Sequence, residues 1–529
     1  MSDILLEIFP LEVIDVILLF MPKNALTSFY NILPEGSILV PVVISRLYKK
    51  TVVSELDELV KAATLATHID KLSFTGKNEL VMFLKENPSF ISKVSFVDIK
   101  AWDEAEYSIL KDIQFKRYSL ELRGLESFDT SLIPQNLEKI ILQFNYDHTL
   151  KPIKEWPRSL SKLTICNHQL LHLIELPNTL EELSCHGVKE MWHSFPPKLQ
   201  KLTIECSNWV PSNELEFPDS LRELLIAYCR LPTVKKIVSK LPMKLRMLRL
   251  GENIGSKLSF LRFPDSIESL HLEQCGIETL EGFMFPKSLR ELTLDYNRIL
   301  NMQNLNYPES LVILRLSCNV IENLDCFDFP RLLRELYISE NGLVSLDGIA
   351  FPELEVLDVS DTLREKTITS LKNAKLPSTL KVLRASGHDV KDWWQTELPD
   401  GLEVLEMKDR FHPERIRFPP SLEQLSLELL SSRKSNVSQL SLPQSLQTLE
   451  ILNGRSDENF VWKLPHLQKM VLIDITGRVN VPLSVGHLRV RNESAKYLKG
   501  LKVSQRLDKC EIYSYRGEFD NDVFKFNDT

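Results

Sequence analysis

One phrase of ten residues recurs through most of this chain of 529 residues. In its clearest copy, from Phe285 to Leu294, an aromatic residue and a proline precede leucines at the fifth, eighth and tenth positions. The prolines of successive copies lie 22 residues apart from Pro242 to Pro352, and 17 to 25 residues apart elsewhere between Pro134 and Pro482. Periodicity of this length predicts a solenoid, in which each repeat buries its apolar face against its neighbours.

The leucines at the eighth and tenth positions predict a short strand, because residues two apart share one face of a strand. Five residues after the first of these two leucines comes a small polar residue, in a column formed by Cys229, Asn253, Cys275, Asn297, Asn319 and Asn341. Such a column predicts a ladder of buried side chains that cap the backbone of the turn after each strand. Together these features match the leucine-rich-repeat consensus. The expected fold is an α/β solenoid, a leucine-rich-repeat arc with a parallel sheet on its concave side.

The prolines predict an extended or 3₁₀ path on the convex side, because proline fixes φ and has no N–H. A repeat of 22 residues leaves no room there for a long α-helix, so we expect an open, gently curved arc. The wording Phe-Pro-x-Ser-Leu also resembles proline-led FNIP-type repeats. Degenerate copies begin near Ile69 and end near Ile512, which places the solenoid at residues 68–516 and a polar tail at 517–529.

Composition and motifs narrow the class of protein. A net charge of −8 argues against nucleic acid as a partner. The apolar stretches at residues 13–21 and 38–44 are too short to cross a membrane, and no signal peptide is recognisable. Most of the cysteines lie on or beside predicted strands, which suits buried thiols in a reducing compartment. We therefore expect a cytoplasmic or nuclear protein with no nucleic-acid or membrane partner.

Catalytic and metal-binding motifs are missing from the sequence. It contains no G-x-G-x-x-G, Walker, G-x-S-x-G or H-E-x-x-H motif. Cys166, His168, His172, Cys185 and His186 could be mistaken for metal ligands, but the repeat itself explains their spacing. We expect no cofactor, no metal and no enzymatic activity.

Residues 1–50 do not fit the repeat. Apolar residues from Ile8 to Met21 recur at spacings of three and four, which predicts a helix that Pro22 ends. A second helix is expected from Asn24 and a third over residues 39–48, and together they carry more apolar surface than about 50 residues bury alone. Residues 51–67 read as a helix that couples this module to the solenoid.

The segment Phe9 to Val13, followed by Ile17, Phe20 to Pro22 and Leu26, resembles the opening of the F-box. That resemblance implies an N-terminal F-box-like module that binds a Skp-type adaptor and through it a cullin ubiquitin ligase. The adaptor-binding residues that it implies are Pro10, Leu11, Glu12, Val13, Ile17, Phe20, Met21 and Pro22. Alternatively, these helices are an ordinary apolar cap on the first edge of the solenoid.

On the concave face, the residue between the two strand leucines points away from the core in every repeat. This column is rich in arginine and aromatic residues in one region, which are types favoured at binding hot spots. The expected target-binding residues are Arg249, His271, Arg315, Tyr337 and Arg384. Neighbouring acidic residues would alternatively make this a self-neutralised face.

These expectations combine into one function. The chain is expected to be the substrate-recognition subunit of a cullin-type (SCF) ubiquitin ligase, with an unknown protein substrate on the arc. The alternative is an intracellular leucine-rich-repeat scaffold or regulator with no ligase connection.

Overall fold

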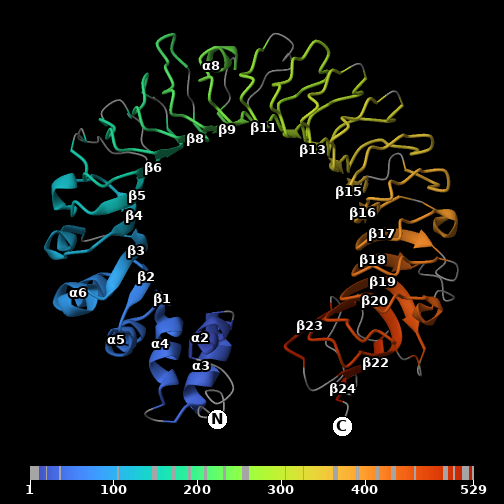
Figure 1. Cartoon of the computed structure of the whole chain (residues 1–529), viewed down its shortest axis with the longest axis horizontal. Helices are drawn as coiled ribbons and strands as arrows, with labels where there is room; N and C mark the ends of the chain where they lie inside the picture. Colours follow the sequence, from blue (N-terminus) through green and yellow to red (C-terminus); the bar gives the residue numbers. More distant parts are fainter. Residues whose placement is uncertain are drawn as a thin grey trace. The chain divides into compact units, whose positions relative to one another are not determined.

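The computed structural model describes most of the chain. The described residues are 11–19, 21–34, 37–103, 107–145, 153, 155–167, 171, 174–188, 192–207, 211–229, 234–252, 261–303, 305–325, 327–361, 367–388, 390, 392–411, 416–429, 436–457, 460, 462–492, 498–503, 507–514 and 524–526. The chain divides into two compact units, Met1–Leu245 and Arg246–Thr529. Within each unit the strands line the inner side and the connecting loops form the outer side (Figure 1).

The first unit begins with three short helices and continues as a parallel sheet. The helices are α2 (Leu11–Leu19), α3 (Lys23–Ile32) and α4 (Leu39–Tyr48). Strands β1 to β9 follow in sequential order, each parallel to the next. Their bounds are Lys50–Val53, Ile69–Thr75, Val94–Asp103, Tyr118–Leu125, Leu137–Phe144, Lys162–Cys166, Glu182–His186, Lys201–Glu205 and Glu223–Ala227. The segments between strands include α5 (Leu56–Leu65), α6 (Asn78–Glu86), α7 (Pro88–Ile91), η1 (Tyr107–Asp112), η2 (Thr130–Leu132) and α8 (Lys235–Val238).

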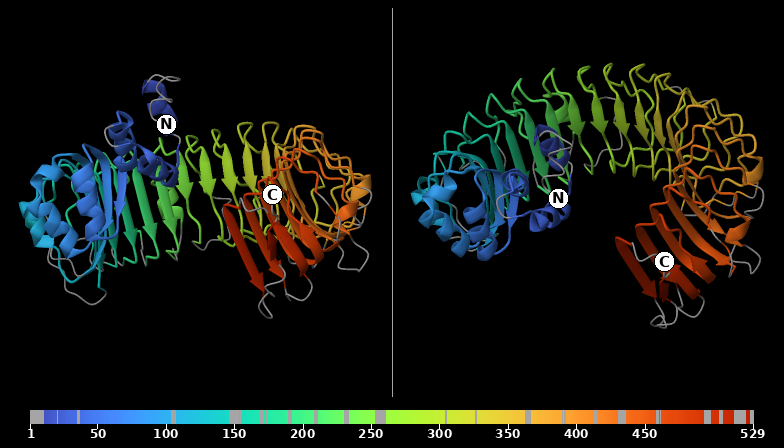
Figure 2. Two further views of the ribbon diagram at one scale, coloured as in Figure 1. Left: turned by 90° about the horizontal axis from the view of Figure 1, so that it is seen from below. Right: turned by 60° about the horizontal axis from the view of Figure 1, so that its bottom comes forward.

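In the second unit, strands β10 to β21 are again parallel and sequential, and they lie side by side (Figure 2). The bounds of β10 to β20 are Met247–Arg249, Ser269–His271, Glu291–Thr293, Ile313–Arg315, Glu335–Tyr337, Val356–Asp358, Val382–Arg384, Val404–Phe411, Gln424–Leu429, Thr448–Ser456 and Lys469–Asn480. The outer loops include η4 (Trp393–Gln395) and η6 (Val437–Gln439). The predicted parallel leucine-rich-repeat sheet is confirmed.

The long strand β20 divides the end of this sheet into two branches. Its first half pairs with β21 (His487–Asn492), which pairs with β23 (Lys509–Ser514). Its second half pairs with β22 (Leu498–Val503), which pairs with β24 (Phe524–Phe526). The expected polar tail at 517–529 therefore contains a strand, because Phe524 and Phe526 extend the second branch.

Hydrogen bonds and ring contacts explain why the ten-residue phrase recurs. The amide of Leu289 donates to the carbonyl of Pro286 (3.2 Å), which closes a tight turn before the strand. The hydroxyl of Ser310, at the serine position of the next copy, donates to the carbonyl of Leu289 (2.7 Å). The aromatic residues before the prolines stack along the outer side, with ring centroids 5.3 Å apart for Phe285 and Tyr307. The proline, the serine and the aromatic residue of the phrase thus each close a turn or join neighbouring repeats.

The predicted polar ladder is also confirmed. Asn297 donates to the carbonyls of Leu272 (2.9 Å) and Leu294 (2.8 Å), and its carbonyl accepts from the amides of Cys275 and Ile277 (both 3.0 Å). Asn319 and Asn341 repeat the two donations to carbonyls, and they accept from the amides of Ile299 and Ile321 (both 3.0 Å). Asn253, in the same column, lies outside the described residues.

The sequence did not predict the backbone conformation beside the ladder. The residue before each ladder position has a left-handed backbone, with φ of 58° at Tyr296, 57° at Cys318 and 53° at Glu340. At His388 the ladder uses an imidazole, which bonds the carbonyl of Val359 (2.6 Å) and accepts from the amide of Ile368 (3.3 Å). The ladder therefore accommodates an imidazole as well as an amide at this position.

The helix expected over residues 51–67 is shorter than predicted. Lys50–Val53 forms β1 and pairs with β2, so α5 begins only at Leu56. Its N-terminus is held by a reciprocal capping box between Glu55 and Glu58. This segment is thus the first turn of the solenoid, with a strand on the inner side and a helix on the outer side.

Candidate functional site

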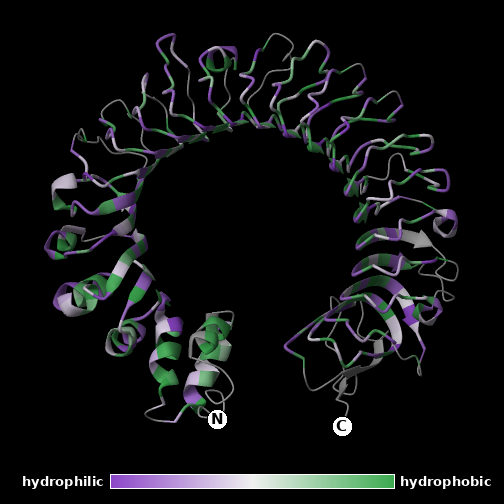
Figure 3. Ribbon diagram, viewed as in Figure 1, coloured by the Kyte–Doolittle hydropathy of each residue, from purple (hydrophilic) through white to green (hydrophobic). Residues whose placement is uncertain are grey.

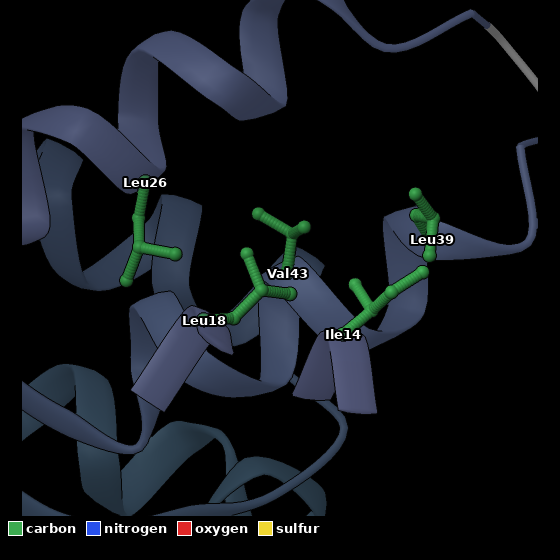
Figure 4. Close-up of a cluster of buried hydrophobic side chains, with 5 residues drawn as sticks. All are labelled: Ile14, Leu18, Leu26, Leu39 and Val43. Carbon is green, nitrogen blue, oxygen red and sulfur yellow. The ribbon is translucent and has the colours of Figure 1, made fainter. Parts of the chain in front are cut away.

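The N-terminal helices are held together by a small apolar core. Ile14 and Leu18 of α2 pack against Leu26 of α3 and against Leu39 and Val43 of α4 (Figure 4). The hydropathy colouring shows α2 and α4 as mostly hydrophobic (Figure 3). The helical module predicted for this region is therefore present as short helices.

A second apolar face of α2 points away from this core. Val13, Val16 and Ile17 are 40%, 55% and 45% exposed, and their spacing of three and four residues places them on one side of the helix. Pro22, between α2 and α3, is also exposed.

The eight residues of the expected adaptor surface therefore differ in solvent exposure. Val13, Ile17 and Pro22 are accessible, whereas Met21 packs partly against the core of the module. Leu11 and Glu12 form the first turn of α2, and Pro10 and Phe20 lie outside the described residues. Val16 was missed by sequence analysis, although its spacing to Val13 could have revealed it.

The expected target-binding residues belong to the column described from the sequence. In the structure this column is a row that runs across the strands on the concave face of the second unit. Strand register places Arg249 beside His271, and Arg315 beside Tyr337, on strands β10 to β14. Arg384 lies in the same row, two strands beyond Tyr337. The repeat frame therefore predicted correctly that these side chains line up.

Each arginine of this row lies beside a carboxylate. Arg249 Nε lies 2.5 Å from Glu273 Oε1, and Arg384 Nε lies 3.0 Å from Glu406 Oε1. Arg315 lies 4.0 Å from Glu291, and its guanidinium carbon is 3.9 Å from the ring centroid of Tyr337. This pattern matches the alternative of a face that neutralises its own charges.

His271 lies in a polar cluster that resembles a catalytic triad, but no carboxylate in the cluster bonds its imidazole. Ser269 Oγ lies 2.7 Å from Nε2 of His271, and Thr293 Oγ1 lies 3.0 Å from Nδ1. The carboxylate of Glu291 accepts from Ser269 and not from the imidazole, so no acid orients the histidine as a general base. Burial lowers the pKa of His271 and raises that of nearby Asp295 to about 6.

A pocket of about 240 Å³ opens on the same face near the end of the second unit. Its walls come from β20, β21 and β23, and it is lined by Lys469, Met470, Val471, His487, Leu488, Arg489, Lys509 and Glu511. Arg489 lies between two strand positions that face the core, where the repeat frame places a concave-face residue, whereas the row of Lys469, His487 and Lys509 lies outside that column. The repeat frame could have found this row, since register aligns these residues.

Other kinds of site are not evident in the described part of the chain. No group of three or more histidine, cysteine or acidic side chains there is placed to hold a metal ion. No helix among the described segments has the length and apolar character needed to cross a membrane. Burial raises the pKa of the Cys229 thiol to about 11, which makes it a poor nucleophile.

Comparison with known proteins adds evidence on the fold. No protein-family model matches the chain, and no curated protein is similar to it in sequence. The crystal structure of the TLR13–ssRNA13 complex superposes with a TM-score of 0.53 at 17% identity, over 84% of this chain and 74% of that chain. This chain has the fold of a leucine-rich-repeat solenoid.

Two other solved structures resemble parts of the solenoid less well. CroV588, described as a novel circular leucine-rich-repeat protein, has a TM-score of 0.48 at 15% identity, over 90% of this chain and 82% of its own. An internalin (InlF) from Listeria monocytogenes has a TM-score of 0.38 at 18% identity, over 59% and 80%.

Proposed function

We propose that this solenoid is the substrate-recognition subunit of a cullin-type (SCF) ubiquitin ligase. In this proposal the N-terminal helices are an F-box-like module that binds a Skp-type adaptor, and FNIP-like repeats carry the protein target on the concave face. The role is not catalytic. By holding the target near a ubiquitin-charged enzyme, the chain raises the effective concentration of the target's lysines.

The supporting observation is the outward apolar face of α2. A helix that served only to complete a small core would carry polar residues on its far side. Here Val13, Val16 and Ile17 occupy that side, next to the Pro-Leu-Glu-Val wording that resembles the F-box. Helix α4 packs against β1 and also against α2 and α3, so α4 covers the first strand of the solenoid. The exposed face of α2 is then available to a partner.

A double substitution on this face tests the proposal. Val13→Asp with Ile17→Asp should abolish binding to a purified Skp-type adaptor, because an unpaired carboxylate in an apolar interface costs several kcal/mol. At about 1.4 kcal/mol per tenfold, this cost weakens binding by about 100-fold or more. Both side chains are accessible, so the circular dichroism spectrum and melting temperature should stay close to those of the wild type.

Val60→Asp provides the matched control, since Val60 is an exposed valine on α5 of the same unit. The control should bind the adaptor like the wild type. If the wild type does not bind a Skp-type adaptor, the ligase proposal fails and an intracellular scaffold or regulator becomes the better account. If the double variant binds as well as the wild type, the contact lies elsewhere on the chain.

A further inference from the structure

Positive charges on the concave face of the second unit are mostly matched by negative ones. Arg249 pairs with Glu273, Arg384 with Glu406, and Lys408 with Glu450. A pair of this kind leaves little charge for a ligand. A place where cations outnumber their carboxylates therefore differs from the rest of this face.

The pocket between β20, β21 and β23 is such a place. Register aligns Lys469 with His487 and His487 with Lys509 in one row across the three strands. The next row on the same face aligns Arg489 with Glu511. Because neighbouring strands are about 4.8 Å apart, each row spans only about 10 Å. Four basic side chains thus surround one carboxylate.

Glu511 is shared by two of these cations. Its Oε2 lies 2.6 Å from Nη2 of Arg489, and its Oε1 lies 2.5 Å from Nζ of Lys509. Hydrogen bonds from Lys509 and Arg489 hold the pKa of Glu511 below its usual value, so it is ionised at neutral pH. Among the described residues, the side chains of Lys469 and His487 contact no hydrogen-bond or ion-pair partner. The pocket thus keeps a surplus of positive charge in a chain of net charge −8.

The shape of the pocket limits the size of its ligand. The apolar side chain on the pocket face is Val471, two residues after Lys469, whereas Met470 and Leu488 are buried in the core beneath the strands. A volume of about 240 Å³ suits a single side chain with an anionic end. The carboxylate of Glu511 already bridges Arg489 and Lys509, which shows that these cations accommodate an oxyanion between them.

We propose that this pocket binds one oxyanionic side chain, a carboxylate or a phosphate monoester, in a peptide segment of a protein target. That the ligand belongs to a protein target rests on the proposed function, whereas the pocket and its charge do not. Lys469 and His487 supply the free donors, and Arg489 and Lys509 become available when Glu511 turns away. Glu511 is therefore an internal competitor that weakens binding in the free protein.

Three fluorescein-labelled peptides of one sequence, with phosphoserine, glutamate or serine at the centre, serve as probes. Fluorescence anisotropy with the full-length protein at low salt measures their affinities, and a labelled oligouridylate of similar length is the fourth probe. We expect the phosphoserine or the glutamate peptide to bind at least about tenfold more tightly than the serine peptide. The two anionic peptides distinguish a phosphate ligand from a carboxylate ligand.

Two substitutions should change the affinity in opposite directions. Glu511→Gln removes the competitor and should strengthen binding of the anionic peptide about tenfold, whereas a purely structural role for Glu511 predicts no gain. Lys469→Glu with Lys509→Gln should weaken it by about tenfold or more. Lys372→Glu with Lys375→Gln, which makes the same charge change of −3 at two exposed lysines outside the pocket, should stay within about twofold of the wild type.

The outcomes are decisive for the pocket. The proposal is overturned if neither anionic peptide binds, if the Lys469/Lys509 variant binds as tightly as the wild type, or if oligouridylate binds more tightly than both peptides. None of these substitutions touches α2, so a failure here leaves adaptor binding by Val13 and Ile17 unaffected. Loss of adaptor binding, conversely, would not change the peptide affinities.

Discussion

The substitution Asn319→Leu gives the most direct test of the polar ladder. Asn319 is 7% exposed, and its amide nitrogen donates to the carbonyls of Leu294 (3.0 Å) and Leu316 (2.9 Å). Its carbonyl oxygen accepts from the amide of Ile299 (3.0 Å). Leucine has a similar size but can form none of these hydrogen bonds.

The loss of unfolding free energy in Asn319→Leu depends on which backbone groups keep a second hydrogen-bond partner. The carbonyl of Leu294 keeps a bond from Asn297 (2.8 Å), and that of Leu316 keeps one from Asn341 (3.0 Å). The amide of Ile299 has no other acceptor among the described residues, so it is left buried and unpaired. One unpaired amide costs about 1–3 kcal/mol, and two weakened carbonyls add about 0.5–1 kcal/mol each. We therefore expect a destabilisation of roughly 2–5 kcal/mol.

Urea unfolding followed by circular dichroism measures this loss, and amide exchange locates it at Ile299. Asn323→Leu is the matched control, because Asn323 is exposed and lies four residues further along the same repeat. The control should change the unfolding free energy by less than about 0.5 kcal/mol. Equal unfolding midpoints for the two variants, with no faster exchange at Ile299, would refute the reasoning.

Three further predictions follow from buried groups. Burial lowers the pKa of His388, so the unfolded chain binds its proton first, and stability should fall as the pH drops below the unfolded value of about 6.5. His388→Asn should remove that part of the acid sensitivity in urea titrations at about pH 5.5 and 7.5. Iodoacetamide at neutral pH should alkylate exposed Cys206 before buried Cys229, as read by peptide mass spectrometry. Gly76→Ala should lower the melting temperature, because a Cβ at Gly76 would overlap the buried side chain of Trp102.

The repeat frame made most of the fold predictable. Leu292 and Leu294 were expected on the buried face of a strand, and both are fully buried in and beside β12. The frame also predicted the ladder, because an asparagine side chain that is buried at the same position in each repeat must form hydrogen bonds there. In contrast, Tyr296 gives no sign of its left-handed backbone, since tyrosine rarely adopts it and the neighbouring turns impose it.

Segments outside the frame were harder to predict. Lys50–Val53 becomes a strand through pairing with β2, a long-range interaction that local helix propensity does not reveal. Phe524–Phe526 is too short to be recognised without its partner β22. The candidate sites show the same limit. Helical spacing is enough to group Val13, Val16 and Ile17 on one side of α2, but it does not show that Met21, after the end of the helix, packs partly against the core of the module.

The hydrogen bonds of the Asn ladder have a consequence for how such a chain can change in length. The side chain of Asn319 donates hydrogen bonds to the carbonyls of Leu294, in the preceding repeat, and Leu316, in its own repeat. A duplication or deletion of one complete segment from Pro286 to Tyr307 would therefore recreate every bond at the junction, because that segment is one full period of 22 residues. A change in length between the strand and the asparagine would instead move the asparagine out of line with its carbonyls, whereas the outer part of the repeat accommodates other lengths, as the 25-residue spacing from Pro352 to Pro377 shows. The chain can thus gain or lose concave surface in whole repeats, with its core unchanged.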